Sequence, residues 1–160
     1  MINFYLYYNG ELDNQHYASC IAQVIKYNFT SELKPIEHII KKIPWYAYHY
    51  AKDVIKVRWK EAEPYIKQSA VNAEDYAKDV IGGRWPEAEP YIMKSTYIAY
   101  NYAKNVIGGR WPEAEPYIMT DGYNAYRYAK TIIGGRWPEA EPYIMEDLTW
   151  WWQYCGHFKL

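Results

Sequence analysis

The sequence predicts an all-α fold, a short α-solenoid of helix-turn-helix repeats with atypical N- and C-terminal caps. The main observation is the segment Gly-Gly-Arg-Trp-Pro-Glu-Ala-Glu-Pro-Tyr-Ile-Met, which occurs three times unchanged and begins at Gly82, Gly108 and Gly134. The copies are 26 residues apart, and a looser copy at 56–67 lies one period earlier. A fixed period of this length indicates small units that bury their apolar faces only by stacking on one another.

The first helix of each repeat is predicted from the copy that starts at Ser95 and runs to Ile107. Ser95 suits the N-cap, because its side-chain oxygen can accept a hydrogen bond from an orphan amide. Gly108 suits the end, because glycine readily takes the left-handed conformation. One buried stripe is predicted at Ala99, Tyr102, Ala103, Val106 and Ile107. The N-caps in the other repeats are Ser69, Asp121 and Asp147, and Pro44 opens the earliest clear first helix.

The second helix of each repeat is predicted to be short. Pro112 is a favourable first residue for a helix of about two turns that ends near Met119. Pro116, four residues on, lacks an N–H group and crowds the preceding turn, so a kinked or 3₁₀-like start is expected.

The repeats extend beyond the identical copies and divide the chain into three parts. Residues 1–32 are expected to form an N-terminal cap segment, with a degenerate first helix over about 13–26 and a strand or extended cover over 1–12. Residues 33–148 form the tandem repeats, since 33–51 aligns without a gap to 85–103. Residues 149–160 form the C-terminal capping helix. In total, six first helices and five second helices are expected.

The phrase YAKDVIGGRWPEAEPYIM at 76–93 resembles short tandem repeats of proteins encoded by large tailed phages and some bacteria. The resemblance covers roughly 33–155, and its Tyr-Ala, Arg-Trp and Glu-x-Glu elements are fairly specific. It implies an α-helical repeat scaffold and points to a viral origin. It supplies no catalytic motif.

The composition argues against several classes of protein. The net charge of −1 gives no bulk attraction to nucleic acid or to an anionic membrane. No apolar run is long enough to span a bilayer, and no signal peptide opens the chain. Cys20 and Cys155 are far apart, which favours free thiols and a reducing compartment, the cytoplasm, or the host cytoplasm if the protein is viral. The four histidines show no metal-ligand spacing, so no metal and no cofactor are expected.

Three rows of residues recur at the repeat period, and each has a structural and a functional interpretation. The tryptophan row suits the core, because Leu33 replaces it in the earliest copy; the alternative is a stacking platform for sugars or bases. The glutamate row suits ion pairs with arginine, because a row of equivalent acids lacks the unequal pair that acid/base catalysis needs. The lysine row suits a solvated face, and the alternative is a track for phosphates. The rows are Trp59, Trp85, Trp111 and Trp137; Glu63, Glu89, Glu115 and Glu141, with Arg58, Arg84, Arg110 and Arg136; and Lys52, Lys78, Lys104 and Lys130.

The positions that differ between near-identical repeats are the candidates for a binding surface. They fall off the predicted stripe, so they are expected to line one outer face of the solenoid. Tyrosine and arginine at such positions are typical of binding hot spots, although neutral drift on a solvated surface explains the variation equally well. The candidate partner-binding residues are Tyr48, His49, Glu74, Asp75, Tyr100, Asn101, Tyr126 and Arg127.

A second candidate is the run Trp150-Trp151-Trp152. A helix cannot bury three consecutive indoles against one neighbour, because they span about 200° of its circumference. Trp151 takes the register of Ala99 and can close the core. Trp150 or Trp152 is therefore expected to be exposed and to bind a partner or a second copy of the chain.

These observations favour a non-enzymatic protein–protein interaction module, such as a phage-encoded factor that binds or inhibits a host protein. The alternative is a nucleic-acid or nucleotide binder along the Lys or Arg row, although nucleic acid is not the expected partner. An enzyme would need His16, Asp13 and Cys20 to converge in a cleft, so no catalytic residue is assigned.

Overall fold

The structure is a computed structural model that describes residue 34 and residues 36–160. It falls into two compact units, one that ends at Ile66 and one that comprises Lys67–Leu160. The expected cover at 1–12 and the expected helix at 13–26 lie outside the described residues, as do Cys20 and His16.

In the first unit, the described residues form one short second-type helix, one long first-type helix and the next short helix. Helix α3 spans Glu37–Ile40 and α4 spans Pro44–His49. The chain continues from α4 into the π-helical segment η2 (Tyr50–Ile55), and α5 follows at Glu63–Ile66. Pro44 is the first residue of α4, as predicted.

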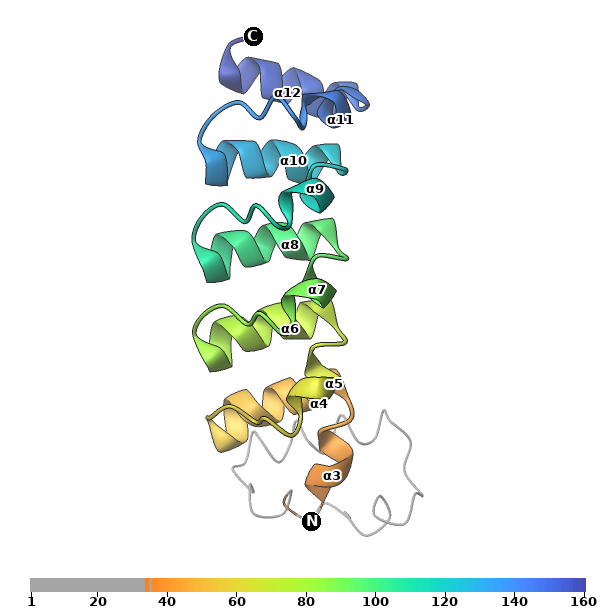
Figure 1. Ribbon diagram of the computed structural model, residues 1–160, viewed down its shortest axis with the longest axis vertical. Helices are drawn as coiled ribbons and strands as arrows, with labels where there is room; N and C mark the ends of the chain where they lie inside the picture. Colours follow the sequence, from red (N-terminus) through yellow and green to blue (C-terminus); the bar gives the residue numbers. More distant parts are fainter. Residues whose placement is uncertain (1–33, 35) are drawn as a thin grey trace. The chain divides into compact units, whose positions relative to one another are not determined.

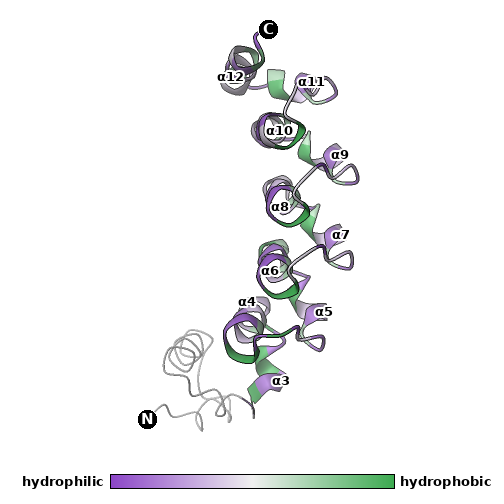
Figure 2. Ribbon diagram, turned by 90° about the vertical axis from the view of Figure 1, so that its left-hand side faces the viewer, coloured by the Kyte–Doolittle hydropathy of each residue, from purple (hydrophilic) through white to green (hydrophobic). Residues whose placement is uncertain are grey.

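In the second unit, long and short helices alternate and form two columns (Figures 1 and 2). One column holds the long first helices, three of which continue into a π-helical segment, and the other holds the short second helices. No strand occurs among the described residues, so the prediction of an all-α repeat fold is confirmed. The first helices are α6 (Ala70–Tyr76) with η3 (Ala77–Ile81), α8 (Thr96–Tyr102) with η4 (Ala103–Ile107), α10 (Gly122–Tyr128) with η5 (Ala129–Ile133), and α12 (Leu148–Phe158). The second helices are α7 (Glu89–Ile92), α9 (Glu115–Ile118) and α11 (Glu141–Met145).

The predicted helix caps are confirmed. The side chains of Ser69, Ser95 and Asp121 each accept a hydrogen bond from the amide three residues later, and Asp147 accepts one from Thr149. The glycines that end the long helices, Gly82, Gly108 and Gly134, have φ of 74°, 72° and 70°. The first unit carries Lys56 in the same place with φ of 56°.

The last turns of the long helices differ from the prediction, because they are π-helical. The Gly108 amide donates to the Ala103 carbonyl at 2.9 Å, a separation of five residues. This wider turn changes the rotation per residue, so a stripe counted with the α-helical period fails there. Ala99, Tyr102 and Ala103 are fully buried as expected, whereas Val106 and Ile107 are only half-buried.

The short helices begin later than predicted. Helix α9 starts at Glu115, and the stretch from Pro112 to Ala114 is a turn in which the Ala114 amide donates to the Trp111 carbonyl at 3.0 Å. That three-residue separation is the expected 3₁₀-like start. Pro116 then lies in the first turn of the helix, where a missing N–H group leaves no bond unmade. The helix is therefore about one turn long and not two.

Candidate interaction surface

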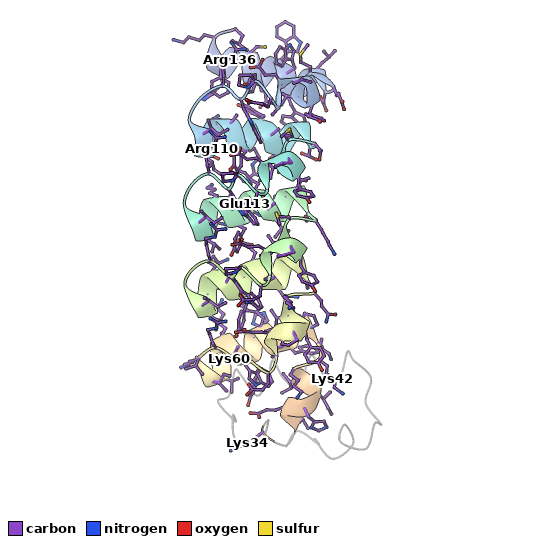
Figure 3. All side chains as sticks on the ribbon, in the orientation of Figure 1. Lys34, Lys42, Lys60, Arg110, Glu113 and Arg136 are labelled. Carbon is purple, nitrogen blue, oxygen red and sulfur yellow. The ribbon has the colours of Figure 1, made fainter. Side chains whose placement is uncertain are left out.

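Successive repeats are joined by a hydrogen-bond network that recurs in each repeat of the second unit. The Arg110 guanidinium donates two bonds of 2.8 Å to the Glu115 carboxylate. The Tyr128 hydroxyl, from the following repeat, donates to Glu115 Oε1 at 3.0 Å and accepts from the Trp111 amide at 2.6 Å. The predicted Arg–Glu pairing is thus confirmed. Figure 3 shows Arg110 and Arg136 in equivalent places one repeat apart. The equivalent networks are Arg84, Trp85, Glu89 and Tyr102, and Arg136, Trp137, Glu141 and Tyr154.

The network sets the ionisation of its members. The hydrogen bonds from Arg110 lower the pKa of Glu115, burial opposes this, and the bond from Tyr128 lowers it further. Burial raises the pKa of Tyr128 and of Tyr102, and the neighbouring glutamate adds to the rise. Glu115 is therefore an ionised acceptor held by Arg110, and Tyr102 and Tyr128 stay neutral hydroxyl groups. The same two-bond contact with arginine recurs at Glu89, with Arg84, and at Glu141, with Arg136.

The tryptophan row lies in the core, as predicted. Trp85 and Trp111 are 1% and 0% exposed, and Trp59 and Trp137 are also buried. Each indole packs on the tyrosine nine residues earlier, with ring centroids 5.0 Å apart for Tyr102 and Trp111. The indole nitrogens of Trp85 and Trp111 have no hydrogen-bond partner among the described residues, so these side chains contribute to the core through their apolar rings.

Four of the predicted partner-binding residues do not line an outer face: Tyr48, Glu74, Tyr100 and Tyr126 are 5%, 6%, 1% and 7% exposed. The expectation of exposure is wrong for this register. In the second unit the cause is contact with the next repeat, 31 residues later. Asn105 donates to Glu74 at 3.2 Å, Tyr100 bonds to Thr131 at 3.1 Å, and Tyr126 meets the His157 ring edge-on. In the second unit, these positions, which differ between repeats, therefore lie at the contacts between one repeat and the next.

The neighbouring register, His49, Asp75, Asn101 and Arg127, is half-buried. His49 Nδ1 lies 3.0 Å from the Asp53 carboxylate, and Asp75 accepts from Lys78 at 2.9 Å. Arg127 differs from the others because its guanidinium lies among three tyrosine rings. Its distances to the ring centroids of Tyr100, Tyr123 and Tyr97 are 4.2, 5.1 and 5.7 Å.

Arg127 is part of a contiguous surface that we call the aromatic ladder, defined by Tyr97, Arg127, Tyr123 and Trp150. The Tyr123 and Trp150 ring centroids are 4.4 Å apart, so each member contacts the next. Tyr97 and Tyr123 are 50% and 39% exposed. Neither tyrosine is among the binding residues predicted from the sequence, although their register also varies, from Trp45 and Val71 to these two tyrosines. That variation was the available signal.

A groove of about 260 Å³ adjoins the last members of the ladder. The aromatic rings of Tyr123, Tyr143 and Trp150 line it. Three carboxylates, from Asp121, Glu146 and Asp147, give its rim a negative charge. One repeat earlier, Lys94 stands at the position equivalent to Thr120, and Thr120 stands at the position equivalent to Glu146. The acidic character of the groove therefore belongs to the C-terminal repeat.

The three consecutive tryptophans have different environments. Trp152 is 75% exposed, which confirms the expectation that at least one of the outer pair is accessible. Trp150 is half-buried against Tyr123, and Trp151 stacks on Tyr154 with ring planes 15° apart. Cys155 takes the register of the buried Ala103 but is only half-buried, because no described helix covers it.

The lysine row lies on the solvated surface of the described residues. All four of its members are exposed, as expected of a solvated face: Lys52, Lys78, Lys104 and Lys130.

Among the described residues, no group of histidine, cysteine and carboxylate side chains is arranged to hold a metal ion. None of the described helices has the length and apolar character required to cross a membrane.

Comparison with protein-family models, with curated proteins and with solved structures finds no match to this chain.

Proposed function

We propose that this protein is a non-enzymatic protein-binding module, and that a partner protein binds to the aromatic ladder. The observation that carries the proposal is the contiguous contact series Tyr97, Arg127, Tyr123 and Trp150, in which Tyr97 and Tyr123 are exposed and the other two are half-buried. Tyrosine, tryptophan and arginine are the side chains that most often dominate binding energy at protein interfaces.

The ladder is also pre-ordered, which favours binding. Arg127 is held over three rings and Trp150 is packed on Tyr123, so few rotamers are lost when a partner docks. The resemblance to repeats of phage proteins supports a host protein as the partner and the host cytoplasm as the place of action.

The alternative, a nucleic-acid or nucleotide binder, has less support. The arginine row is occupied, because Arg84, Arg110 and Arg136 each make two hydrogen bonds to a glutamate. Such paired guanidinium groups offer little net charge to a phosphate backbone. In the lysine row, Lys78 is paired with Asp75 and Asp79.

The test is affinity capture from a lysate of the native host with the double substitution Tyr123→Ala and Trp150→Ala. We expect the wild-type chain to retain a specific protein in nuclease-treated lysate at moderate salt, and the double variant to lose it. The matched control is Tyr117→Ala, which removes a side chain of similar exposure (51%) on α9 outside the ladder. Circular dichroism checks that all chains stay helical.

Two results would overturn the proposal. One is an unchanged set of captured proteins with the double variant. The other is capture of nucleic acid by the wild-type chain with an affinity that falls steeply with salt, which would favour the alternative.

A further inference from the structure

The groove at the end of the aromatic ladder lies between two layers of the stack, with described helices on both sides. Asp121 is the N-cap of α10 and Tyr123 lies in its first turn. Tyr143 belongs to α11, and Asp147 and Trp150 belong to the start of α12. The groove is therefore built by three helices of consecutive repeats.

A glycine at the start of α10 allows α11 to lie against it. A Cβ atom at Gly122 would lie 2.9 Å from the Tyr143 carbonyl oxygen and 3.2 Å from the Ile144 Cα atom, closer than side chains tolerate. Any other residue at this position would push the α11 backbone away. Because of this close approach, aromatic rings from α10 and α11 line one groove.

The groove combines accessible aromatic rings with carboxylates that have no cationic partner. Tyr123 and Tyr143 are 39% and 37% exposed. Asp121 and Asp147 each use Oδ1 to accept a backbone amide of the helix that they cap, at 2.8 Å. Neither they nor Glu146 is paired with a lysine or arginine among the described residues. Carboxylates and the faces of aromatic rings both attract cations.

Two repeats earlier, the chain places its own cations on the tyrosine equivalent to Tyr143. That tyrosine is Tyr91, and the Nζ atoms of Lys67 and Lys94 lie 5.6 and 5.2 Å from its ring centroid. The last repeat keeps the tyrosine ring and replaces both lysines, one of them with a carboxylate. The residues at the two replaced positions are Met119 and Glu146.

The charge of the connection that follows each short helix also changes along the second unit. The first two connections carry one lysine each, the third carries one aspartate, and the fourth carries a glutamate and an aspartate. These connections are residues 67–69, 93–95, 119–121 and 145–147. A cation from outside is therefore repelled at the first two connections and attracted at the last.

We propose that this groove binds a cationic side chain, lysine or arginine, presented by the partner protein. This inference rests on the proposed function and adds the chemistry that the partner must offer. The aliphatic stem of either residue can pack on the tyrosine and tryptophan rings while its charged end meets the carboxylates of the rim. Arg127 lies 5.1 Å from the Tyr123 ring centroid and adds one positive charge nearby, which the three carboxylates outweigh.

The experiment is an NMR titration of the ¹⁵N-labelled full chain at constant ionic strength. The probes are N-acetyl-arginine amide and N-acetyl-lysine amide, and N-acetyl-citrulline amide is the neutral control with the shape of arginine. We expect both cations to shift the signals of the Tyr123 and Tyr143 amides and of the Trp150 indole N–H group. The expected Kd is on the order of 1–10 mM for the cations and at least about tenfold weaker for citrulline.

Glu146→Lys is the decisive variant, because it restores the lysine that the chain carries at the equivalent Lys94. It is expected to weaken the binding of both cations by at least about tenfold. Glu113→Lys makes the same change in charge at an exposed position that does not line the groove, so it should leave their binding unchanged. In the lysate capture, Glu146→Lys should reduce the retained partner, and Glu113→Lys should not.

Three results would overturn the inference: equal binding of citrulline, shifts that map outside the groove, or equal effects of Glu146→Lys and Glu113→Lys. The outcome also separates this inference from the proposed function. A partner that is captured through Tyr123 and Trp150, with no binding of the cations in the groove, would leave the proposed function standing and reject the cation site. Binding of the cations with no captured partner would reject the proposed function and leave the preference of the groove for cations.

Discussion

The Glu74 carboxylate of one repeat accepts a 3.2 Å hydrogen bond from the Asn105 side chain of the next. Glu74 is 6% exposed, and its burial raises its pKa above the ordinary 4.5. The bond from Asn105 and the charge of Lys78 lower the pKa, while Asp75 and Asp79 raise it. The net rise means that the folded chain holds a proton at Glu74 more tightly than the unfolded chain does.

This rise predicts that Glu74→Gln stabilises the protein at neutral pH. With the folded pKa above the unfolded one, stability falls as pH rises through that interval, and the penalty persists at pH 7. Glutamine keeps an acceptor for Asn105 and removes the buried charge, so we expect a gain of about 0.5–1 kcal/mol at neutral pH. Well below pH 4.5 this pH-dependent gain should vanish, because the Glu74 carboxyl is protonated in both states there. Urea unfolding at neutral pH and in acid measures this difference in stability. The control is Glu113→Gln, at an exposed position. A loss of stability at neutral pH would contradict the argument.

Glu115→Gln should have the opposite effect. Its folded pKa is lowered, so the stability that its ionised form contributes is present above the ordinary value of 4.5 and disappears as pH falls through the folded pKa. At neutral pH we expect a loss of about 1–2 kcal/mol, limited because the Arg110 side chain is 54% exposed and screened by solvent. The same unfolding series should show this loss shrinking in acid. A loss that does not change with pH would indicate a packing effect only.

Tyr128→Phe isolates the hydroxyl that joins two repeats. The substitution leaves the ring on Trp137 and removes both the acceptor for the Trp111 amide and a donor to Glu115. We expect a loss of about 1–3 kcal/mol, since a buried N–H group is left without a partner. Tyr117→Phe, on the exposed surface of α9, should change stability by less than about 0.5 kcal/mol. Equal effects of the two substitutions in thermal unfolding would rule out the network as the cause.

Lys56→Gly should stabilise the first unit. Lys56 has φ of 56°, where the three equivalent positions carry glycine. A residue with a side chain costs about 1–2 kcal/mol in the left-handed region. Glycine avoids this cost but loses more backbone entropy on folding, which offsets part of the benefit. We therefore expect a net gain in stability of about 0.5–1 kcal/mol. The converse substitution, Gly108→Ala, should destabilise by a similar amount through conformation alone, because no atom lies within 4 Å of the added Cβ. Unfolding midpoints that move in the same direction for both substitutions would contradict this account.

Local signals predicted much of the fold. Ser95 and Asp121 as N-caps, Gly108 as the terminator and the period of 26 residues act over a few residues or one repeat, and all were confirmed in the described residues. The π-helical turn at Ala103–Ile107 was missed, because its hydrogen-bond period leaves no distinct residue pattern. The late start of α9 was missed for a related reason, since proline suits several positions in a first turn.

The candidate site was harder to predict, because exposure depends on the neighbouring repeat. Tyr100 falls off the stripe of its own helix, yet Thr131 and the helix around it bury it. A helical wheel describes one helix and one buried face, whereas a helix inside a stack has two. Tyr97, about one turn earlier in the same helix, faces neither of these two buried sides and is 50% exposed.

The tyrosine hydroxyl bridges give the stack of the second unit a direction. The loop around Trp111 is completed by Tyr128 and the loop around Trp137 by Tyr154, so each loop depends on the repeat that follows it in the chain. Ribosomal synthesis releases the N-terminal repeats first, and each of them waits for its successor before its loop can close. Helix α12 therefore completes the last loop of this column. A chain cut just before α12 would lose Tyr154 and leave the Trp137 amide without its acceptor.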